Sequence, residues 1–238
     1  MRVLGPDDAD PRPAVLLFHG CGGVREHIDT YARAASEAGY RAFIIDSYAA
    51  RGWDRNFALA FVCSGVMLRG AERAGDVLAS LWGVANRPDV DPARVVLAGW
   101  SHGGWSIMDL MTMNLGHPGS ASLANPQDAS LDGVRGVALY YPYIGIGSLT
   151  RLRQWRHRPQ VLGVMARHDH LTSVEGAETV YRNLVTAGVP VETWIAEGTH
   201  SFDEPMTAPP MRYHPDLSDE ALRRFGALLG DVAVAPAA

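Results

Sequence analysis

A serine flanked by glycines follows directly on an apolar run, at Gly99-Trp100-Ser101-His102-Gly103. The spacing matches G-x-S-x-G, a turn between a strand and a helix that presents the serine hydroxyl as a nucleophile. Because a serine hydroxyl is a weak nucleophile by itself, this chemistry also needs a base and an orienting carboxylate. The alternative interpretation is a surface serine in a flexible turn.

Asp169 and His200 supply these partners in the required order of serine, acid and histidine. Each lies at the C-terminal end of a predicted strand, which favours a catalytic role for Ser101, Asp169 and His200 over a loop aspartate and a surface histidine. Asp203 and Glu197 are competing acids. Both are so close to His200 in sequence that neither is well placed to orient its imidazole.

Two further histidines, His168 and His170, bracket Asp169 and raise the question of a metal site. Neighbouring residues of an extended segment point in opposite directions, and no HExxH or HxHxDH pattern accompanies them. We therefore expect no metal and no cofactor.

Acyl transfer also requires two N–H donors that hold the oxyanion of the intermediate. The residue after the nucleophile supplies the first, the backbone N–H of His102. The glycine-rich turn at residues 19–23 offers the second, for which we predict Cys21, with Gly22 as the alternative. The Cys21 thiol lacks the nucleophile turn, so we expect it to be a wall residue or a disulfide partner.

The elements that must position these residues alternate between buried strands and amphipathic helices. This alternation predicts one mainly parallel sheet with helices on both faces, and active sites of such sheets lie beyond the C-terminal strand ends. The predicted strands are residues 13–20, 40–46, 94–100, 134–141, 159–169 and 191–198; the predicted helices are residues 27–39, 66–87, 102–114, 173–188 and 218–230.

The chain has 238 residues, of which 47% are hydrophobic, enough for one sizeable core. We expect a single domain over residues 1–238, with a short N-terminal lead at 1–12 and a C-terminal tail at 231–238. Gly230 is the predicted end of the last helix and Ser218 its capped start.

The net charge of −5 and the scattered arginines argue against nucleic acid as a partner. The chain contains no lysine, which excludes a Walker-type phosphate loop and a lysine Schiff base.

Because no apolar run approaches a membrane span and no secretion signal is present, we expect no membrane association and a cytoplasmic location. We expect a monomer or a homodimer.

The two cysteines, Cys21 and Cys63, show no metal-ligand spacing. Buried free thiols are the favoured interpretation and a single bridge is the alternative. For two arginines of the central region, Arg51 and Arg73, a solvated or salt-bridged surface role is favoured over binding of an anionic substrate.

Taken together, these residues resemble the dienelactone hydrolase-like branch of the α/β-hydrolases over nearly the whole chain. The likeness rests on PAVLLFHGCGG, DSYAARGW, ERAGDVLASLWGVANRPDVDPARVVLAGWSHGG, RHDHLTSVEGAETVYRNL and GTHSFDEP. It implies an α/β-hydrolase fold in which Ser101, Asp169 and His200 act on a carboxylic ester or a related acyl bond of a small molecule.

The chain departs from the enzymes that open dienelactone itself, which carry cysteine where this chain has Ser101. They also place a glutamate where this chain has Gly20, and an arginine shortly after the catalytic histidine, where this chain continues Ser201-Phe202-Asp203-Glu204. These departures argue against dienelactone as the substrate. The antiparallel hairpin that opens many such sheets is expected to be reduced or absent.

Substrate contacts are assigned to Gly22, Trp105 and Tyr143, although a packing role is equally expected for the two aromatic residues. Two functions from other classes are alternatives. One is a small peptidase or amidase of the prolyl-oligopeptidase type, and the other is a hydrolase fold that binds without catalysis.

Overall fold

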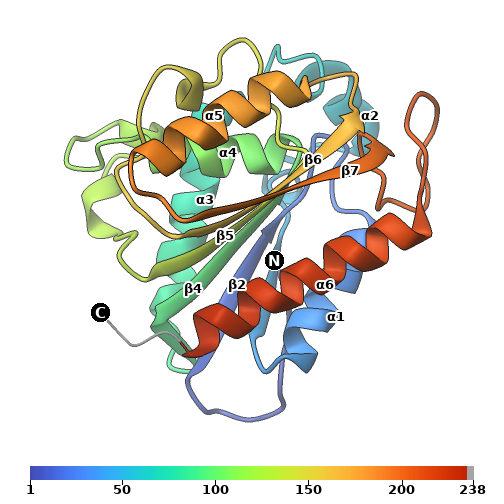
Figure 1. Ribbon diagram of the computed structural model, residues 1–238. Helices are drawn as coiled ribbons and strands as arrows, with labels where there is room; N and C mark the ends of the chain where they lie inside the picture. Colours follow the sequence, from blue (N-terminus) through green and yellow to red (C-terminus); the bar gives the residue numbers. More distant parts are fainter. Residues whose placement is uncertain (235–238) are drawn as a thin grey trace.

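A seven-stranded sheet forms the centre of the protein in the computed structural model, which describes residues 1–234 (Figure 1). The strands lie in the order β1-β3-β2-β4-β5-β6-β7, and within the described residues every neighbouring pair is parallel except β1 with β3. The predicted α/β fold is therefore confirmed. The strands are β1 Arg2–Leu4, β2 Arg12–Phe18, β3 Arg41–Ile45, β4 Val90–Trp100, β5 Val134–Tyr140, β6 Gln160–His168 and β7 Val191–Thr199.

Helices cover both faces of this sheet, as its two apolar faces require. Helices α1 and α6 pack on one face, and α3, α4 and α5 pack on the other (Figure 1). No helix within residues 1–234 is long and apolar enough to cross a membrane. The main helices are α1 Glu26–Glu37, α3 Gly70–Ala85, α4 His102–Met111, α5 Val174–Thr186 and α6 Pro215–Val234.

Alternate side chains of the central strands enter the two halves of the core. In β2, Leu16 and Phe18 pack toward α3 and α4, whereas Val15 and Leu17 pack toward α1 and α6. The parallel register pairs Phe18 of β2 with Gly99 of β4. The loops that follow these two strands consequently leave the sheet side by side, which is where the predicted nucleophile turn and glycine-rich turn must meet.

Both ends of the chain are more ordered than predicted. A three-residue strand, β1, lies within the expected lead and pairs with β3, so the opening hairpin is reduced to this one short strand. Helix α6 begins at Pro215, before the predicted cap Ser218, and passes through Gly230 to Val234. It continues because Val232 is buried against the sheet beyond the glycine. Of the predicted tail, residues 231–234 are helical and 235–238 lie outside the described residues.

A separate cap segment, residues 47–69, folds over the C-terminal ends of β2 and β3. It contains short helical turns, among them α2 Arg55–Phe57 and η2 Ala58–Val62, and has its own small apolar cluster of Tyr48, Ala58, Val62 and Leu68. Cys21 and Trp53 pack against this cluster.

The cap segment is joined to the glycine-rich turn by a disulfide between Cys21 and Cys63, so the expectation of free thiols was wrong. The two Cα atoms are 5.1 Å apart although the residues are separated by 42 positions, a proximity that only the folded cap creates. In the chain-entropy treatment, a loop of that size stabilises the folded state by about 4 kcal/mol. Disulfides persist mainly in oxidising compartments, which weighs against the cytoplasmic location expected above.

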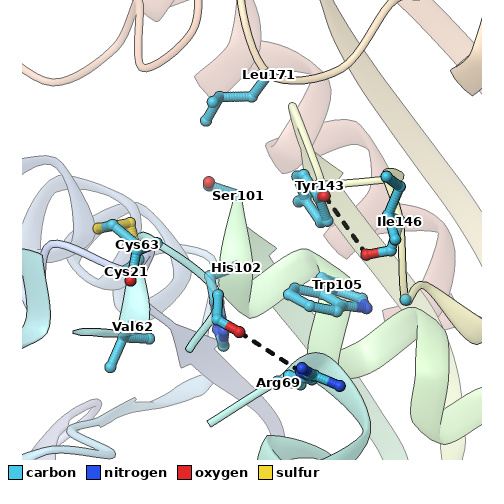
Figure 2. A pocket seen from close by; sticks show the side chains of 13 residues that line it. Cys21, Val62, Cys63, Arg69, Ser101, His102, Trp105, Tyr143, Ile146 and Leu171 are labelled. Atoms are coloured by element: carbon cyan, nitrogen blue, oxygen red, sulfur yellow. Dashed lines mark hydrogen bonds between the residues drawn. A yellow bond between two sulfur atoms is a disulfide. The ribbon is translucent and has the colours of Figure 1, made fainter. Parts of the chain in front are cut away.

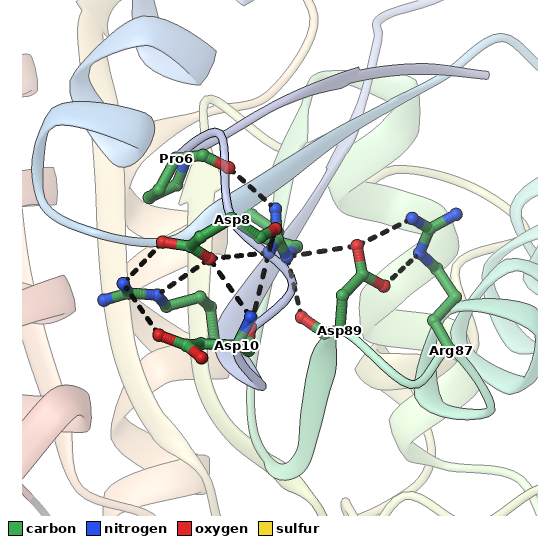
Figure 3. A network of polar contacts seen from close by, with 7 residues as sticks. Pro6, Asp8, Asp10, Arg87 and Asp89 are labelled. Atoms are coloured by element: carbon green, nitrogen blue, oxygen red, sulfur yellow. Dashed lines mark hydrogen bonds and ion pairs between the residues drawn. The ribbon is translucent and has the colours of Figure 1, made fainter.

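At the opposite end of the sheet, Arg41 joins three chain segments. Figure 3 shows the polar network to which Pro6, Asp8 and Asp89 of these segments belong. Its guanidinium, almost fully buried, donates to the carbonyl oxygens of Pro6 and Asp89 at 3.0 and 2.7 Å and forms ion pairs with Asp8 and Asp89 at 2.9 and 3.1 Å. These bonds fasten the N-terminal segment and the turn before β4 to the start of β3.

We expect Arg41→Met to lower the free energy of unfolding by about 2 to 3 kcal/mol, because two carboxylates and the carbonyls of Pro6, Asp8, Asp10 and Asp89 lose a charged donor. Urea unfolding followed by circular dichroism measures this loss. Since Arg41 lies far from the C-terminal strand ends, the kcat of the folded variant is expected to stay within about twofold of the parent. A stability change below about 0.5 kcal/mol would contradict the structural role.

Candidate active site

The turn at Ser101 has the strained backbone that a nucleophile turn requires. Ser101 adopts φ 50° and ψ −110°, a conformation that non-glycine residues rarely adopt. A Cβ atom at Gly103 would lie 2.1 Å from the carbonyl oxygen of Phe18, and one at Gly99 would lie 2.6 Å from the amide nitrogen of Gly104. The two glycines are therefore needed because neighbouring backbone approaches too closely for any side chain.

The three residues predicted to act together lie in one hydrogen-bonded series. Nδ1 of His200 is 2.7 Å from Oδ2 of Asp169, and Nε2 of His200 is 2.9 Å from Oγ of Ser101. Since the carboxylate accepts from Nδ1–H, Nε2 is left unprotonated to accept the serine hydroxyl. Oδ1 of Asp169 accepts from the amides of Leu171 and Thr172 at 2.7 and 3.2 Å, which holds the carboxylate in place.

The two predicted oxyanion donors flank Ser101. His102 is the first residue of α4, so its N–H has no partner within the helix, and Cys21 lies in the turn after β2. Neither N–H donates to another group within residues 1–234. Gly22, the alternative, also has an amide without a partner in the described chain. The sheet register places both segments beside the serine, as the predicted site requires.

Asp203, considered above as a competing acid, is buried and contacts other groups. It accepts hydrogen bonds from Tyr31 Oη at 3.1 Å, Trp100 Nε1 at 3.0 Å and Tyr141 Oη at 2.5 Å. Burial and the charge of Asp203 raise the pKa of Tyr141 well above its ordinary value, so the phenol stays protonated and donates. The ring of Tyr141 packs 4.7 Å from that of His200. Asp203 therefore holds in place Trp100 and Tyr141, two aromatic side chains that lie beside the catalytic residues.

Two cavities open on Ser101. One, the Trp105 pocket, has a volume of about 320 Å³ and extends past His102, Trp105 and Tyr143 (Figure 2). The other, the His200 pocket, has a volume of about 310 Å³ and is lined by Gly22, His200 and residues of the 203–211 loop. Leu171 and the Cys21–Cys63 disulfide border both cavities.

The predicted substrate contacts are thus divided between the cavities. Trp105 and Tyr143 face each other in the Trp105 pocket, with ring centroids 4.8 Å apart, and Gly22 lies in the His200 pocket. Figure 2 shows the disulfide on one side of Ser101 and these two aromatic residues on the other. Leu171 and the particular cap residues that line the cavities, such as Val62 and Arg55, were not identified from the sequence, because no local pattern indicates which side chains of a covering loop face which strand end.

Arg73 was also misjudged, since it is fully buried rather than on the surface. A signal was present in the sequence: position 73 falls on the same helical stripe as the buried residues Val77, Leu81 and Val84. Arg51 has the surface role expected, in an ion pair of 2.8 Å with Asp76.

Within residues 1–234, no group of three or more histidine, cysteine or acidic side chains is arranged to hold a metal ion.

Asp109, on α4, supports one wall of the Trp105 pocket. Its Oδ1 accepts from the amide of Leu149 at 2.7 Å, and its Oδ2 has no partner in the described chain. Burial raises the pKa of Asp109 to about 7.

We expect this carboxyl to make stability depend on pH. Between about pH 4 and 7 the folded protein keeps a proton that the unfolded chain releases, so the free energy of unfolding falls as pH rises, by at most about 1.4 kcal/mol per pH unit. The unfolding free energy of the parent minus that of Asp109→Asn, measured by urea denaturation, should be smaller at pH 7 than at pH 5. Asp128→Asn, at an exposed carboxylate, is the control. An Asp109 difference that does not vary with pH would refute the expectation.

Comparison with known proteins identifies the family of the chain. The profile of the dienelactone hydrolase family matches residues 1–233. The chain belongs to the dienelactone hydrolase family. This membership supports a hydrolase that acts on esters. No curated protein matches the chain in sequence.

Solved structures share the α/β-hydrolase fold at low sequence identity. A protein from Klebsiella pneumoniae subsp. pneumoniae, assigned as a dienelactone hydrolase, is 20% identical with a TM-score of 0.70, covering 96% of this chain and 91% of its own. Esterase 2 of Thermogutta terrifontis, phosphonylated by sarin, is 16% identical with a TM-score of 0.70, covering 98% and 90%. A dienelactone hydrolase-like promiscuous phosphotriesterase from metagenomic libraries is 16% identical with a TM-score of 0.64, covering 94% and 88%.

Proposed function

We propose that this member of the dienelactone hydrolase family is a serine hydrolase that cleaves carboxylic esters of small molecules through an acyl-enzyme intermediate. The observation that carries the proposal is the hydrogen-bonded series from Asp169 through His200 to Ser101, beside two amides that have no partner within residues 1–234. No metal or other cofactor has a part in this mechanism.

In the first half of the reaction, Oγ of Ser101 attacks the acyl carbon while its proton passes to Nε2 of His200. Asp169 stabilises the imidazolium that forms, and the amides of Cys21 and His102 hold the oxyanion. The tetrahedral intermediate then expels the alcohol, which takes the proton from His200. In the second half, His200 activates a water molecule that releases the acid from Ser101.

This proton route indicates which part of the ester each cavity would hold. The departing oxygen must lie within reach of Nε2 of His200, so the alcohol occupies the His200 pocket and the acyl chain occupies the Trp105 pocket. A volume of about 320 Å³ suits a short or medium acyl chain. The Thermogutta terrifontis esterase of the same fold is described with butyrate bound and with propionate bound, which agrees with this size.

Hydrolysis of p-nitrophenyl esters from acetate to decanoate tests the proposal and ranks acyl length. A fluorophosphonate probe, followed by intact mass and peptide mapping, identifies the nucleophile in the same preparation. We expect turnover and one adduct on Ser101. A folded protein that releases no nitrophenol and takes no label would refute catalysis by Ser101, and preferred cleavage of an aminoacyl amide would instead indicate a peptidase.

A further inference from the structure

A fully buried arginine lies directly behind the two segments that carry the oxyanion donors. Arg73 of α3 donates from Nη1 to the carbonyl oxygen of His19 at 2.8 Å and to Nδ1 of His102 at 3.0 Å. Its Nε donates to Oγ of Ser47 at 3.0 Å. One guanidinium nitrogen therefore joins the turn after β2 to the start of α4.

None of the described carboxylates forms an ion pair with Arg73. The nearby Asp76 pairs with Arg51, and Asp46 accepts from the amides of Tyr48 and Ala49. Transfer of an unpaired charge into a protein interior is costly, so a buried guanidinium bonded only to neutral groups calls for an explanation. Its positive charge is left to act on any negative charge that develops nearby.

The histidines around Arg73 are neutral, and their tautomers follow from their partners. Because arginine only donates, Nδ1 of His102 must accept, and burial, together with the Arg73 charge, lowers the pKa of His102 to about 3. Nε2 of His19 accepts from the amide of Ser47 at 3.2 Å, so its Nδ1–H donates to the carbonyl oxygen of Gly20 at 2.7 Å. The close approach of Arg73 Nη2 to that Nδ1 is then a contact rather than a hydrogen bond.

This arrangement controls the direction of the Cys21 amide. The carbonyl of Gly20 and the N–H of Cys21 belong to one planar peptide group, in which they point in opposite directions. His19 Nδ1–H and the amide of Gly23, at 3.2 Å, both hold the Gly20 carbonyl, so they also hold the Cys21 N–H. Arg73 donates both to the carbonyl oxygen of His19, the residue before Gly20, and to Nδ1 of His102, so it connects the two segments that carry the oxyanion donors.

We propose that Arg73 is a positioning residue of the oxyanion hole, holding the Cys21 and His102 amides in place and directing an unpaired positive charge toward the oxyanion. The inference rests on the proposed function. The guanidinium lies over the ring of Tyr48 but has no carboxylate partner within residues 1–234. It meets an anion only when the tetrahedral intermediate forms, so it acts on the chemical step rather than on substrate binding.

Kinetics of Arg73→Met and Arg73→Lys, with the p-nitrophenyl ester that the parent prefers, test this role. We expect kcat of Arg73→Met to fall about 10²- to 10³-fold with KM within about threefold, because the loss resembles removal of one oxyanion donor. Lysine keeps the charge but not the planar fork, so its kcat should fall only about tenfold. Arg41→Met is the matched control, a buried arginine at the opposite end of the sheet whose loss is expected to lower stability and spare kcat.

The outcomes separate this inference from the function on which it rests. An unchanged kcat in folded Arg73→Met, a loss confined to KM, or an equal kcat loss in the methionine and lysine variants would overturn the role of Arg73 while Ser101 labelling in the parent stands. A parent that neither turns over nor labels Ser101 would overturn both. If Arg73→Met does not fold, Arg73→Lys decides, since an unchanged kcat or a changed KM there also refutes the proposal.

Discussion

Replacement of Ser101 by alanine is expected to reduce ester turnover by about four to six orders of magnitude while the fold remains intact. The variant loses the only oxygen within hydrogen-bond distance of Nε2 of His200 in the described chain. Alanine keeps the Cβ atom, so the unusual φ of 50° at this position costs the same before and after the change. The free energy of unfolding should change by less than about 1 kcal/mol.

Hydrolysis of p-nitrophenyl butyrate and the mass of the fluorophosphonate adduct measure this loss. Ser106→Ala is a matched control, because it removes a buried hydroxyl of the adjoining helix α4, one that donates to the His102 carbonyl at 2.8 Å and lines neither cavity. Turnover in Ser101→Ala within tenfold of the parent would show that another group is the nucleophile.

The second large effect is expected for Asp169→Asn, with kcat reduced by about 10⁴-fold. Asparagine is nearly the same size, and its oxygen still accepts from the amides of Leu171 and Thr172, so the loop keeps its shape. Its amide nitrogen would then face Nδ1 of His200 and donate to it, which places the proton of the imidazole on Nε2. In that tautomer His200 cannot accept the proton of Ser101.

A companion variant, Asp203→Asn, shows whether the fall in kcat is specific to Asp169 or would follow from removing any buried carboxylate near the site. Asp203 accepts from Tyr31, Trp100 and Tyr141, whereas the acid that pairs with His200 in the described chain is Asp169. We expect it to lower the free energy of unfolding by about 2 to 3 kcal/mol and kcat by less than about tenfold. If Asp203→Asn lost kcat as severely as Asp169→Asn, the assignment of Asp169 as the orienting acid would be wrong.

The proximity of Ser101, Asp169 and His200 was predictable because each follows a strand of the parallel part of the sheet. Parallel strands end at the same edge of a sheet, so a residue just beyond one of them lies close to residues beyond its neighbours. The glycines around Ser101 identified the turn itself, since Gly103 approaches the Phe18 carbonyl too closely for any Cβ atom. The pattern itself spans five adjacent positions and can be read from the sequence, although the backbone that requires glycine at position 103 belongs to the distant strand β2.

Helix ends were predicted less well. Gly230 is a favourable residue for a helix end, but α6 continues past it because Val232 is buried against the sheet. The gain from burying an apolar side chain exceeds the cost of about 1 kcal/mol for glycine within a helix. Tertiary packing overrides a local preference in this case.

The sequence by itself determined the sheet, the nucleophile turn and the order of the reactive side chains, because apolar strand patterns and the G-x-S-x-G spacing are each contained in a few adjacent positions. Only the tertiary structure decided what surrounds those side chains. The Cys21–Cys63 disulfide joins residues 42 positions apart, and the Tyr31–Asp203 hydrogen bond joins residues 172 positions apart. The burial of Arg73 behind the predicted oxyanion hole depends likewise on how the cap, α3 and α4 pack together. Contacts between distant segments form only when the whole chain is folded, so a local pattern such as the helical stripe of Arg73 indicates burial but not which groups surround the side chain.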